Sequence, residues 1–195
     1  MEYPKIETLF ERDEKTFKVY PDRLRDPVYG SFKQWQFTEK INGTNIRIMW
    51  DPSTPLSVEI TATGSTPVLI PAPRRLKFGG RTDAANIPAD LVSYLYETIT
   101  EEMMQAVFPN APAIIYGEGY GAGINSGGSY SKTKQFIVFD VLVGKRHWLT
   151  WENVCDVSTK LGLKTVPEIG TWSLEDGIEF VKNGFFSPLA KQQTG

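Results

Sequence analysis

The chain has 195 residues, of which 41% are hydrophobic and 12% are aromatic, so it can bury a sizeable core and suits one domain better than two. Its net charge of −2 gives no global basic field of the kind that marks many nucleic-acid binders, so any polyanion has to meet a local patch. The single cysteine, Cys155, and the single histidine, His147, exclude an internal disulfide framework and argue against a zinc site or a Cys/His nucleophile pair.

The start of the chain indicates a cytosolic, reduced protein. Residues 1–5 lack the apolar core of a signal peptide, and no apolar run in the sequence reaches membrane-spanning length. Residues 3–11 have the pattern of a short extended piece. The segment that follows, up to Gly30, is charged and rich in proline, which favours a surface connection.

Lys40 lies between two segments with the pattern of strands. Residues 34–38 and 45–49 alternate polar with apolar or aromatic side chains, which is the period of half-buried strands. The pattern predicts a hairpin with Lys40 at its bend and Gly43 three residues later. A solvated loop lysine fits equally well, because a chain of this length contains about one Lys-x-x-Gly match by chance. A second match begins at Lys77 and has only a loop context.

A basic segment follows the next predicted strand. Residues 56–62 alternate as a third strand would, and residues 63–67 contain the glycine and proline that end it. Within residues 71–81, four basic residues are interleaved with Phe78 and two glycines. They are Arg74, Arg75, Lys77 and Arg81. A solvated charged loop and a phosphate-binding loop both fit this composition.

The clearest helical pattern covers residues 88–108. Apolar residues recur there at four-residue spacing: Leu91, Leu95, Ile99, Met103 and Val107. This spacing predicts one amphipathic helix, with Asp90 near its start and the apolar stripe in the core. Residues 151–161 and 173–182 are also predicted to be helical, the second beginning with a Ser-x-x-Asp capping pattern at Ser173.

Two apolar runs, residues 113–116 and 135–142, are predicted to be strands joined by a long glycine-rich hairpin. The glycine-rich stretch also satisfies the Gly-x-Gly-x-x-Gly/Ala fingerprint of dinucleotide-binding folds, with Asp140 at a suitable distance. That fingerprint requires a helix directly after the glycines to hold the pyrophosphate. Residues 124–135 contain two glycines, four serines or threonines and no apolar stripe, so a nicotinamide-binding fold is not expected.

Taken together, these pieces follow the order of motifs in the covalent nucleotidyltransferase superfamily of polynucleotide ligases and capping enzymes. The chain resembles most closely the ATP-dependent RNA ligases. Glu39-Lys40-Ile41-Asn42-Gly43-Thr44-Asn45 is similar to motif I, Gly80-Arg81-Thr82 to a second motif, Tyr116-Gly117-Glu118 to motif III and Phe139-Asp140 to motif IIIa. Asn42 stands where the common form of motif I has aspartate, a position that varies among RNA ligases. Four matches in order are specific, whereas any one alone is weak.

The resemblance implies a role for each of the matching residues. Lys40 would attack the α-phosphate of ATP and carry AMP as a phosphoramidate. Nucleotide-binding roles are implied for Glu39, Asn45, Arg81, Glu118 and Phe139, and phosphate or RNA contacts for Arg74, Arg75 and Lys77. A divalent cofactor, Mg²⁺ or Mn²⁺, is implied near Glu118 and Asp140, directly or through water. Two alternatives stay open, with Phe139 as a plain core residue and Asp140 as a strand-end cap.

The chemistry suits these residue types. A lysine attacks phosphorus as the neutral amine, which desolvation and nearby positive charge favour. Arg81 has a planar fork that matches phosphate oxygens two at a time. Glu118 can accept hydrogen bonds from ribose hydroxyls or orient metal-bound water, and Phe139 offers a flat face for adenine. Gly43 is expected to let the backbone turn tightly beside Lys40.

The expected fold class is α+β, with antiparallel β-sheets and flanking helices that enclose an ATP cleft. Residues 1–195 would form a single ATP-grasp-like nucleotidyltransferase (adenylation) domain. In the family, motif IV is a Glu-Gly pair and motif V is two closely spaced lysines, and neither follows Gly184. The domain is therefore expected to be truncated before motifs IV and V, either as a shortened ligase domain or as the nucleotide-recognition half.

The function implied is ATP-dependent RNA ligation: formation of lysyl-AMP, transfer of AMP to a 5′-phosphate end, and phosphodiester formation with a 3′-hydroxyl. The expected partner is RNA or an RNA-containing nicked duplex, with no membrane and no obligate protein partner. A cytoplasmic protein of a cell or of a phage fits this role. Two alternatives remain, one a fragment that binds nucleotide or RNA ends without sealing them. The other is DNA ligation or guanylyl transfer by the same lysine chemistry.

Overall fold

The computed structural model describes residues 1–55, 59–63, 66–70, 74–125 and 129–191. The chain falls into two units, each compact by itself. Unit 1 is Met1–Glu2 with Ile41–Val166, and unit 2 is Tyr3–Lys40 with Pro167–Gly195. Among the described residues, no helix is both long and apolar enough to cross a membrane.

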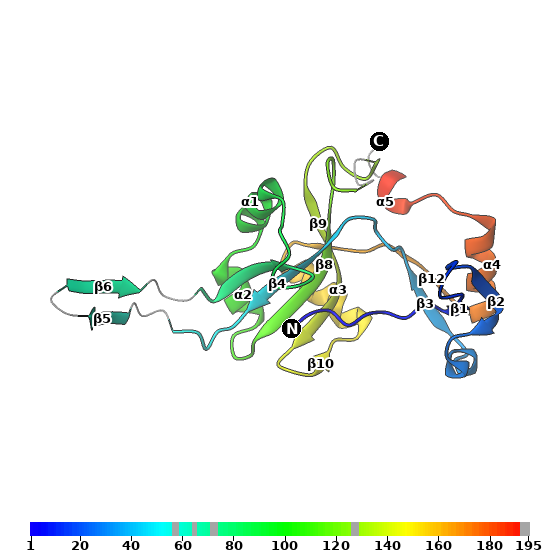
Figure 1. The fold of residues 1–195 in the computed structure, drawn as a ribbon, viewed down its shortest axis with the longest axis horizontal. Helices are drawn as coiled ribbons and strands as arrows, with labels where there is room; N and C mark the ends of the chain where they lie inside the picture. Colours follow the sequence, from blue (N-terminus) through cyan, green and yellow to red (C-terminus); the bar gives the residue numbers. More distant parts are fainter. Residues whose placement is uncertain (56–58, 64–65, 71–73, 126–128, 192–195) are drawn as a thin grey trace. The chain divides into compact units, whose positions relative to one another are not determined.

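Unit 1 is built on a six-stranded sheet with the order β10–β9–β8–β4–β7, in which β11 also pairs with β9. The strands are β4 (Thr44–Trp50), β7 (Leu76–Gly80), β8 (Ala113–Tyr120), β9 (Gln135–Val143), β10 (His147–Trp148) and β11 (Lys164–Thr165). All neighbours are antiparallel except β11, which runs parallel to β9. Figure 1 shows β4, β8 and β9 at the centre of this unit. The strands predicted at residues 45–49, 113–116 and 135–142 are confirmed.

One face of this sheet carries the hydrophobic core. The strands contribute alternate apolar residues, among them Ile46, Ile48, Ile115 and Val138. The helices α1 (Ala89–Thr98), α2 (Glu101–Val107) and α3 (Trp151–Lys160) add Leu91, Leu95, Met104 and Val154 to the same cluster. Because successive side chains of a strand point to opposite faces, the residues between these strand positions lie on the other face.

The helix predicted over residues 88–108 is two helices, α1 and α2, so the prediction of one continuous helix is wrong. Residues 98–100 are all β-branched, which disfavours a helix interior. The hydroxyl of Thr100 then caps α2 by accepting a hydrogen bond from the Met103 N–H at 3.3 Å. The break rotates the second helix, so that Met104 is fully buried while Met103 lies at the margin of the core.

The predicted glycine-rich hairpin is confirmed, because β8 pairs antiparallel with β9 along its full length. The described residues of the connection, 121–125 and 129–134, contain no α-helix, in agreement with the rejection of a dinucleotide fingerprint. A separate antiparallel pair, β5 (Glu59–Thr63) with β6 (Thr66–Ile70), precedes β7. It confirms the described part of the third predicted strand, whose first three residues lie outside the described residues.

The described residues of unit 2 form two small antiparallel pairs, a 3-10 turn and two helices. The pairs are β1 (Phe10–Arg12) with β2 (Val19–Leu24), and β3 (Trp35–Thr38) with β12 (Glu168–Trp172). The remaining elements are η1 (Pro27–Ser31), α4 (Leu174–Asn183) and α5 (Pro188–Lys191). Its aromatic rings pack in series, with Trp172 lying 5.6 Å from Phe37 and 5.0 Å from Phe180 between centroids.

In unit 2 the predicted capping pattern is confirmed, because the Ser173 hydroxyl accepts a hydrogen bond from the Asp176 N–H at 3.1 Å. The strand predicted at residues 34–38 is β3. The surface connection predicted up to Gly30 is largely exposed, but it contains the strand β2. Its prolines and charges tend to occur on such exposed edges, so composition alone did not reveal the strand.

Two predicted connections are wrong. β3 and β4 do not form a hairpin around Lys40, because β3 pairs with β12 while β4 pairs with β7 and β8. Alternation along a segment identifies a strand but does not identify its partner. The basic segment is also not a loop throughout, since Leu76–Gly80 forms β7 and places Lys77 opposite Met49.

Candidate functional site

The face of the sheet opposite the core brings together several of the polar residues singled out from the sequence. Asn45 on β4 pairs in register with Glu118 on β8. Asn45 and Glu118 therefore occupy one row across the sheet. On the other side of β4, Gly80 at the end of β7 pairs with Ile46, and Arg81 follows directly after that strand.

A bulge in β9 includes Phe139 and Asp140, and Asp140 pairs with Tyr116, two residues before Glu118 on β8. The register of β8 with β9 jumps from Tyr116↔Asp140 to Gly117↔Val138 and passes over Phe139. In a bulge of this kind two residues oppose one on the partner strand, and the local twist re-aims their side chains. Phe139 and Asp140 are half-buried, and the Asp140 carboxylate accepts a hydrogen bond from the Val141 N–H at 2.9 Å.

Tyr116, opposite this bulge, is fully buried. Its hydroxyl donates to the carbonyl oxygen of Met1 at 3.0 Å, and its ring lies 5.4 Å from that of Trp148. Burial raises the pKa of the Tyr116 phenol, and the nearby positive charge of Arg47 opposes that rise. Tyr116 is therefore a buried, neutral side chain in the same row of the sheet as Asp140.

Gly43 is held on both sides by residues of the β8–β9 hairpin. Its N–H donates to Oε1 of Glu118 at 3.1 Å, and its carbonyl oxygen accepts from Nδ2 of Asn125. Asn125 has a φ of 47°, in the left-handed region that asparagine tolerates better than most residues. The sequence reasoning did not identify Asn125, although an Asn in a glycine-rich connection is a signal for such a conformation.

Lys40 is exposed and is the last residue of its segment of unit 2. Only three residues of chain lead from Lys40 to Gly43, so their Cα atoms lie within about 11 Å. Just before it, Glu39 is buried, and its Oε2 atom has no hydrogen-bond partner among the described residues. The Oδ1 atom of Asn45 is also buried and also has no hydrogen-bond partner among the described residues. Buried acceptors without donors are costly, so both atoms mark places where a ligand donor would be favourable.

Arg47 is a second residue that the sequence reasoning missed. It lies two positions after Asn45 on the same face of β4, and its side chain is 1% exposed. Its Nε donates to the carbonyl of Gly80 at 2.6 Å, and Nη2 lies 2.8 Å from Oδ1 of Asp83. A charged residue between two buried isoleucines was the available signal, because buried arginines need specific partners.

The other basic residues do not form one patch. Arg74 donates to the Tyr96 hydroxyl on α1 at 2.7 Å, on the core side of the sheet, and Arg75 donates to the carbonyl of Thr54 at 2.8 Å. Lys77 alternates with the core residues of β7 and therefore shares the face that carries Arg47. A single phosphate-binding loop made of all four basic residues is thus not what the structure shows.

The carboxylates of Glu118 and Asp140 could supply only some of the ligands that a divalent metal ion requires. Glu118 and Asp140 lie on adjacent strands, and Asp140 pairs with Tyr116, two residues before Glu118. The described ranges contain no group of three or more His, Cys, Asp or Glu side chains placed to hold an ion. Mg²⁺ and Mn²⁺ favour oxygen ligands, and Mg²⁺ is commonly bound by one or two carboxylates together with water and substrate phosphates. The residues present fit an ion of that kind.

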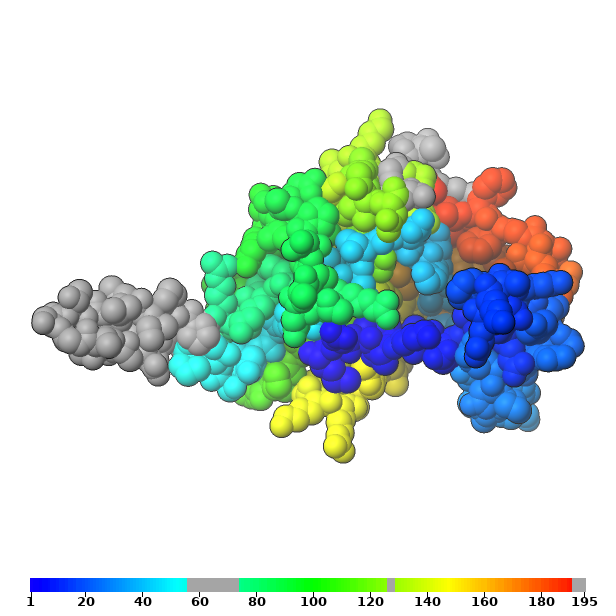
Figure 2. Space-filling model, in the orientation of Figure 1, coloured from blue at the N-terminus to red at the C-terminus, as the bar shows by residue number. Residues whose placement is uncertain are grey.

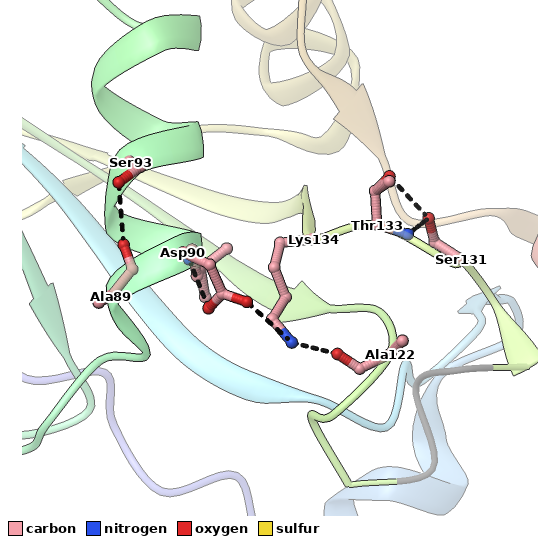
Figure 3. Close-up of polar contacts among 8 residues, drawn as sticks. Ala89, Asp90, Ser93, Ala122, Ser131, Thr133 and Lys134 are labelled. Atoms are coloured by element: carbon pink, nitrogen blue, oxygen red, sulfur yellow. Dashed lines mark hydrogen bonds and ion pairs between the residues drawn. The ribbon is translucent and has the colours of Figure 1, made fainter.

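A groove of about 480 Å³ lies between α1 and the β8–β9 connection, away from the predicted residues. Lys134 lies in it, with Nζ donating to the carbonyl of Ala122 and lying 3.4 Å from the Asp90 carboxylate (Figure 3). Lys132 and Glu97 also line the groove, so its two lysines face two carboxylates. This balance gives no excess positive charge for a phosphate.

Comparisons with known proteins identify a shared fold. A variant of a Naegleria gruberi RNA ligase with ATP and Mn is 17% identical, with a TM-score of 0.58 over 88% of this chain and 49% of that one. A second variant, with AMP and Mn, is 17% identical, with a TM-score of 0.57 over 98% of this chain and 47% of that one. An apo variant is 18% identical, with a TM-score of 0.56 over 89% and 45% of the two chains.

This chain thus spans less than half the length of those ligase structures. A search of curated protein sequences gives no match. The sequence model of the RNA ligase family, in contrast, matches residues 33–190, which is most of the chain. The chain belongs to the RNA ligase family.

Proposed function

We propose that this chain is the adenylation part of an ATP-dependent RNA ligase, in which Lys40 becomes covalently linked to AMP. The observation that carries the proposal is the hydrogen bond of 3.1 Å from the Gly43 N–H to Glu118. It fastens the segment that follows Lys40 to the strand whose outer face carries the candidate nucleotide-binding residues. Family membership and the ATP, AMP and Mn in the Naegleria ligase structures support the assignment.

The proposed reaction has three steps. The ε-amine of Lys40 attacks the α-phosphorus of ATP, so that an N–P bond forms, the bond to pyrophosphate breaks and the amine loses a proton. The terminal phosphate of a 5′-phosphorylated RNA then attacks the same phosphorus, which takes the AMP and releases the lysine. Finally, a 3′-hydroxyl attacks the RNA phosphate, forming a phosphodiester bond and releasing AMP.

The polar face suits the binding steps. Arg81 presents a planar fork for phosphate oxygens, and Lys77 adds a positive charge to the same side of β7. The buried acceptor atom of Asn45 can take a hydrogen bond from an N–H or O–H group of the nucleotide, and Glu39, which belongs to unit 2, has a buried acceptor of the same kind. Phe139 provides an aromatic face on which adenine can stack.

The acidic residues complete the proposed site. Glu118 accepts from ribose hydroxyls in addition to Gly43, and Asp140 helps to hold a divalent ion. Such an ion would neutralise the charge that develops on the phosphates. Arg74 and Arg75, which lie off this face, are proposed to contact the backbone of RNA or of a nicked duplex at a distance from the nucleotide.

A second candidate is a protein that binds nucleotides or RNA ends without sealing them. One observation favours it: the buried acceptor atoms of Glu39 and Asn45 suit binding, whereas Lys40, the side chain that would react, is exposed. The two candidates share the binding residues and differ in whether Lys40 reacts and whether strands are joined.

Labelling with ATP tests both. The protein is incubated with ATP labelled at the α-phosphate and with Mg²⁺ or Mn²⁺, and the products are separated on a denaturing gel. We expect covalent label on the wild-type chain and none on Lys40→Ala. Lys77→Ala, the matched Lys-x-x-Gly variant, should still become labelled, at a lower rate, because Lys77 contributes positive charge but does not carry AMP. Label that survives Lys40→Ala would contradict the proposal. Label without joining of a nicked RNA duplex would support AMP attachment but not sealing.

A further inference from the structure

We propose that Arg47 and Asp83 form a positioning pair that fixes the Arg81 loop (residues 80–83) in the shape needed to bind a 5′-phosphate. This inference rests on the proposed function, because it takes Arg81 as a phosphate ligand. It adds Arg47, which contacts the loop, and Asp83, which belongs to the loop, and neither residue needs to touch the RNA.

The guanidinium of Arg47 holds the Arg81 loop at both ends. Nε bonds to the Gly80 carbonyl at 2.6 Å, just before Arg81, and Nη2 bonds to the Asp83 carboxylate at 2.8 Å, just after Thr82. A guanidinium is planar and rigid, so these two bonds fix the separation of the two ends. Gly79 leaves room for it, because a Cβ there would lie 3.2 Å from Nη2.

Stability alone explains this arrangement poorly. A buried guanidinium loses its hydration, and this cost is offset only by close partners. In the described part of the chain the one ion-pair partner of Arg47 is Asp83, whose side chain is 91% exposed. An exposed carboxylate is screened by water, and an apolar side chain could fill the same space without any desolvation cost. The pair does fix the backbone conformation of the Arg81 loop, because it holds both ends of the loop.

The fixed path leaves Arg81 available to a ligand. Arg81 is exposed and has no hydrogen bond or ion pair of its own within the described residues. It follows directly after Gly80, which pairs with Ile46, the neighbour of Asn45 on β4. A loop that is already ordered loses less conformational freedom when phosphate binds, which favours affinity and alignment.

The positioning role and simple electrostatics predict opposite changes in RNA affinity when Asp83 is removed. Asp83 is negative and lies two residues from the proposed phosphate ligand, so simple electrostatics predicts that its removal strengthens RNA binding. The positioning role predicts the opposite for the part of the affinity that comes from the terminal phosphate. The two effects separate when RNAs with and without that phosphate are compared.

The first test measures loop order without any ligand. Trypsin cleaves after Arg81 only when the loop opens locally, and mass spectrometry follows this cut relative to the cut after Arg146. Arg146 lies in the exposed turn before β10, the yellow projection in Figure 2. We expect Asp83→Ala to raise relative cleavage after Arg81 by about fivefold. Asp83→Asn keeps an acceptor for Arg47 and should lie between Asp83→Ala and the wild type.

A matched control removes the same charge elsewhere. Asp156→Ala breaks the exposed Lys160–Asp156 pair, whose atoms are 2.6 Å apart, and leaves the Arg81 loop untouched. We expect wild-type cleavage after Arg81 in this variant. Equal cleavage in the wild type and Asp83→Ala would overturn the positioning role.

The second test measures recognition of the phosphate. Fluorescence anisotropy gives the affinities for RNAs that differ only in a 5′-phosphate or a 5′-hydroxyl, and their ratio isolates the phosphate contribution. We expect Asp83→Ala to lower this ratio by about fivefold, in the direction of Arg81→Ala, while Asp156→Ala keeps it. An unchanged ratio in Asp83→Ala beside a lowered ratio in Arg81→Ala would overturn the positioning role alone. A wild-type ratio of one would overturn both this role and the proposed function.

Discussion

The N–H of Gly43 donates to Oε1 of Glu118 across 3.1 Å and joins two segments that are 75 residues apart in the chain. A Cβ at position 43 would lie 2.2 Å from the carbonyl oxygen of Gly119. The glycine of the Lys-x-x-Gly pattern is therefore required by close approach of two backbones. Gly43 is not among the residues with positive φ, so the expected tight turn is not the reason for it.

Substitution of this glycine should damage both the fold and the chemistry. Gly43→Ala is expected to destabilise the protein by about 1–3 kcal/mol, because the backbone of β8 cannot move aside easily. Thermal unfolding followed by circular dichroism measures the loss, and labelling by ATP should fall with it. Gly30→Ala is the control, because its Cβ would meet only the flexible end of Leu24 at 3.3 Å. A Gly43→Ala protein with wild-type stability would disprove this explanation.

Asn125 should matter for labelling more than for stability. Asn125→Gly removes the side chain that bonds to the Gly43 carbonyl, yet glycine adopts the left-handed φ of this position without strain. We expect melting within a few degrees of wild type and a labelling rate lower by about tenfold, because the segment after Lys40 is less well held. Asn125→Ala adds backbone strain and should lower the melting temperature as well. Wild-type labelling by Asn125→Gly would show that this contact is dispensable.

Phe139 distinguishes a stacking role from a core role. If adenine stacks on it, Phe139→Leu should weaken nucleotide binding by about 1–3 kcal/mol, as measured by calorimetry. The melting temperature should change little, because the side chain is only half-buried. Phe136→Leu is the matched control, since Phe136 belongs to the core on the opposite face and should affect melting without affecting affinity. The reverse pattern would assign Phe139 to the core.

The Arg47–Asp83 pair should make the melting temperature of the protein depend on pH in the acid range. The hydrogen bond from Arg47, and then its charge, lower the pKa of Asp83 below the ordinary value of 3.8. Because the pKa of Asp83 is lower in the folded state, the charged carboxylate stabilises the fold at pH values above the pKa of the unfolded state. This stabilisation disappears as the pH falls through the pKa of the folded state. The melting temperature of wild type should therefore exceed that of Asp83→Asn at neutral pH. The difference should vanish in acid, and a difference independent of pH would contradict the pairing.

Local patterns were sufficient for elements that depend on neighbours in sequence. Ser173 begins α4 because a side-chain cap is decided within one turn. The strands β8 and β9 were visible as apolar runs, and the glycines between them argued correctly against a helix. Asn45, Glu118, Phe139 and Asp140 were placed on strands, and the register adds that Asn45 and Glu118 are directly paired and that Asp140 is opposite Tyr116.

Features that depend on distant parts of the chain were not predictable in this way. Lys40 has strand patterns on both sides, but the partners of those strands are encoded far away, at residues 76–80, 113–120 and 168–172. The role of Arg47 depends on Asp83, which becomes its neighbour only when β7 pairs with β4. Asn125 likewise contacts Gly43 only after β8 and β4 have paired.

The order of strands in the sheet also has a consequence for how the protein forms. The pairs β4–β7 and β8–β9 connect segments that are nearer in sequence, as in Ile46↔Gly80 and Ala113↔Val143, than the segments of the β4–β8 pair, as in Thr44↔Gly119. Such non-local pairing is slow, because a long loop must close before the contacts form. We therefore expect the two local pairs to form first and the β4–β8 seam to close last. During synthesis on the ribosome, the unpaired edges of β4 and β8 would then be the surfaces most exposed to aggregation. The Gly43–Glu118 hydrogen bond would form only when these two strands have paired and the sheet is complete.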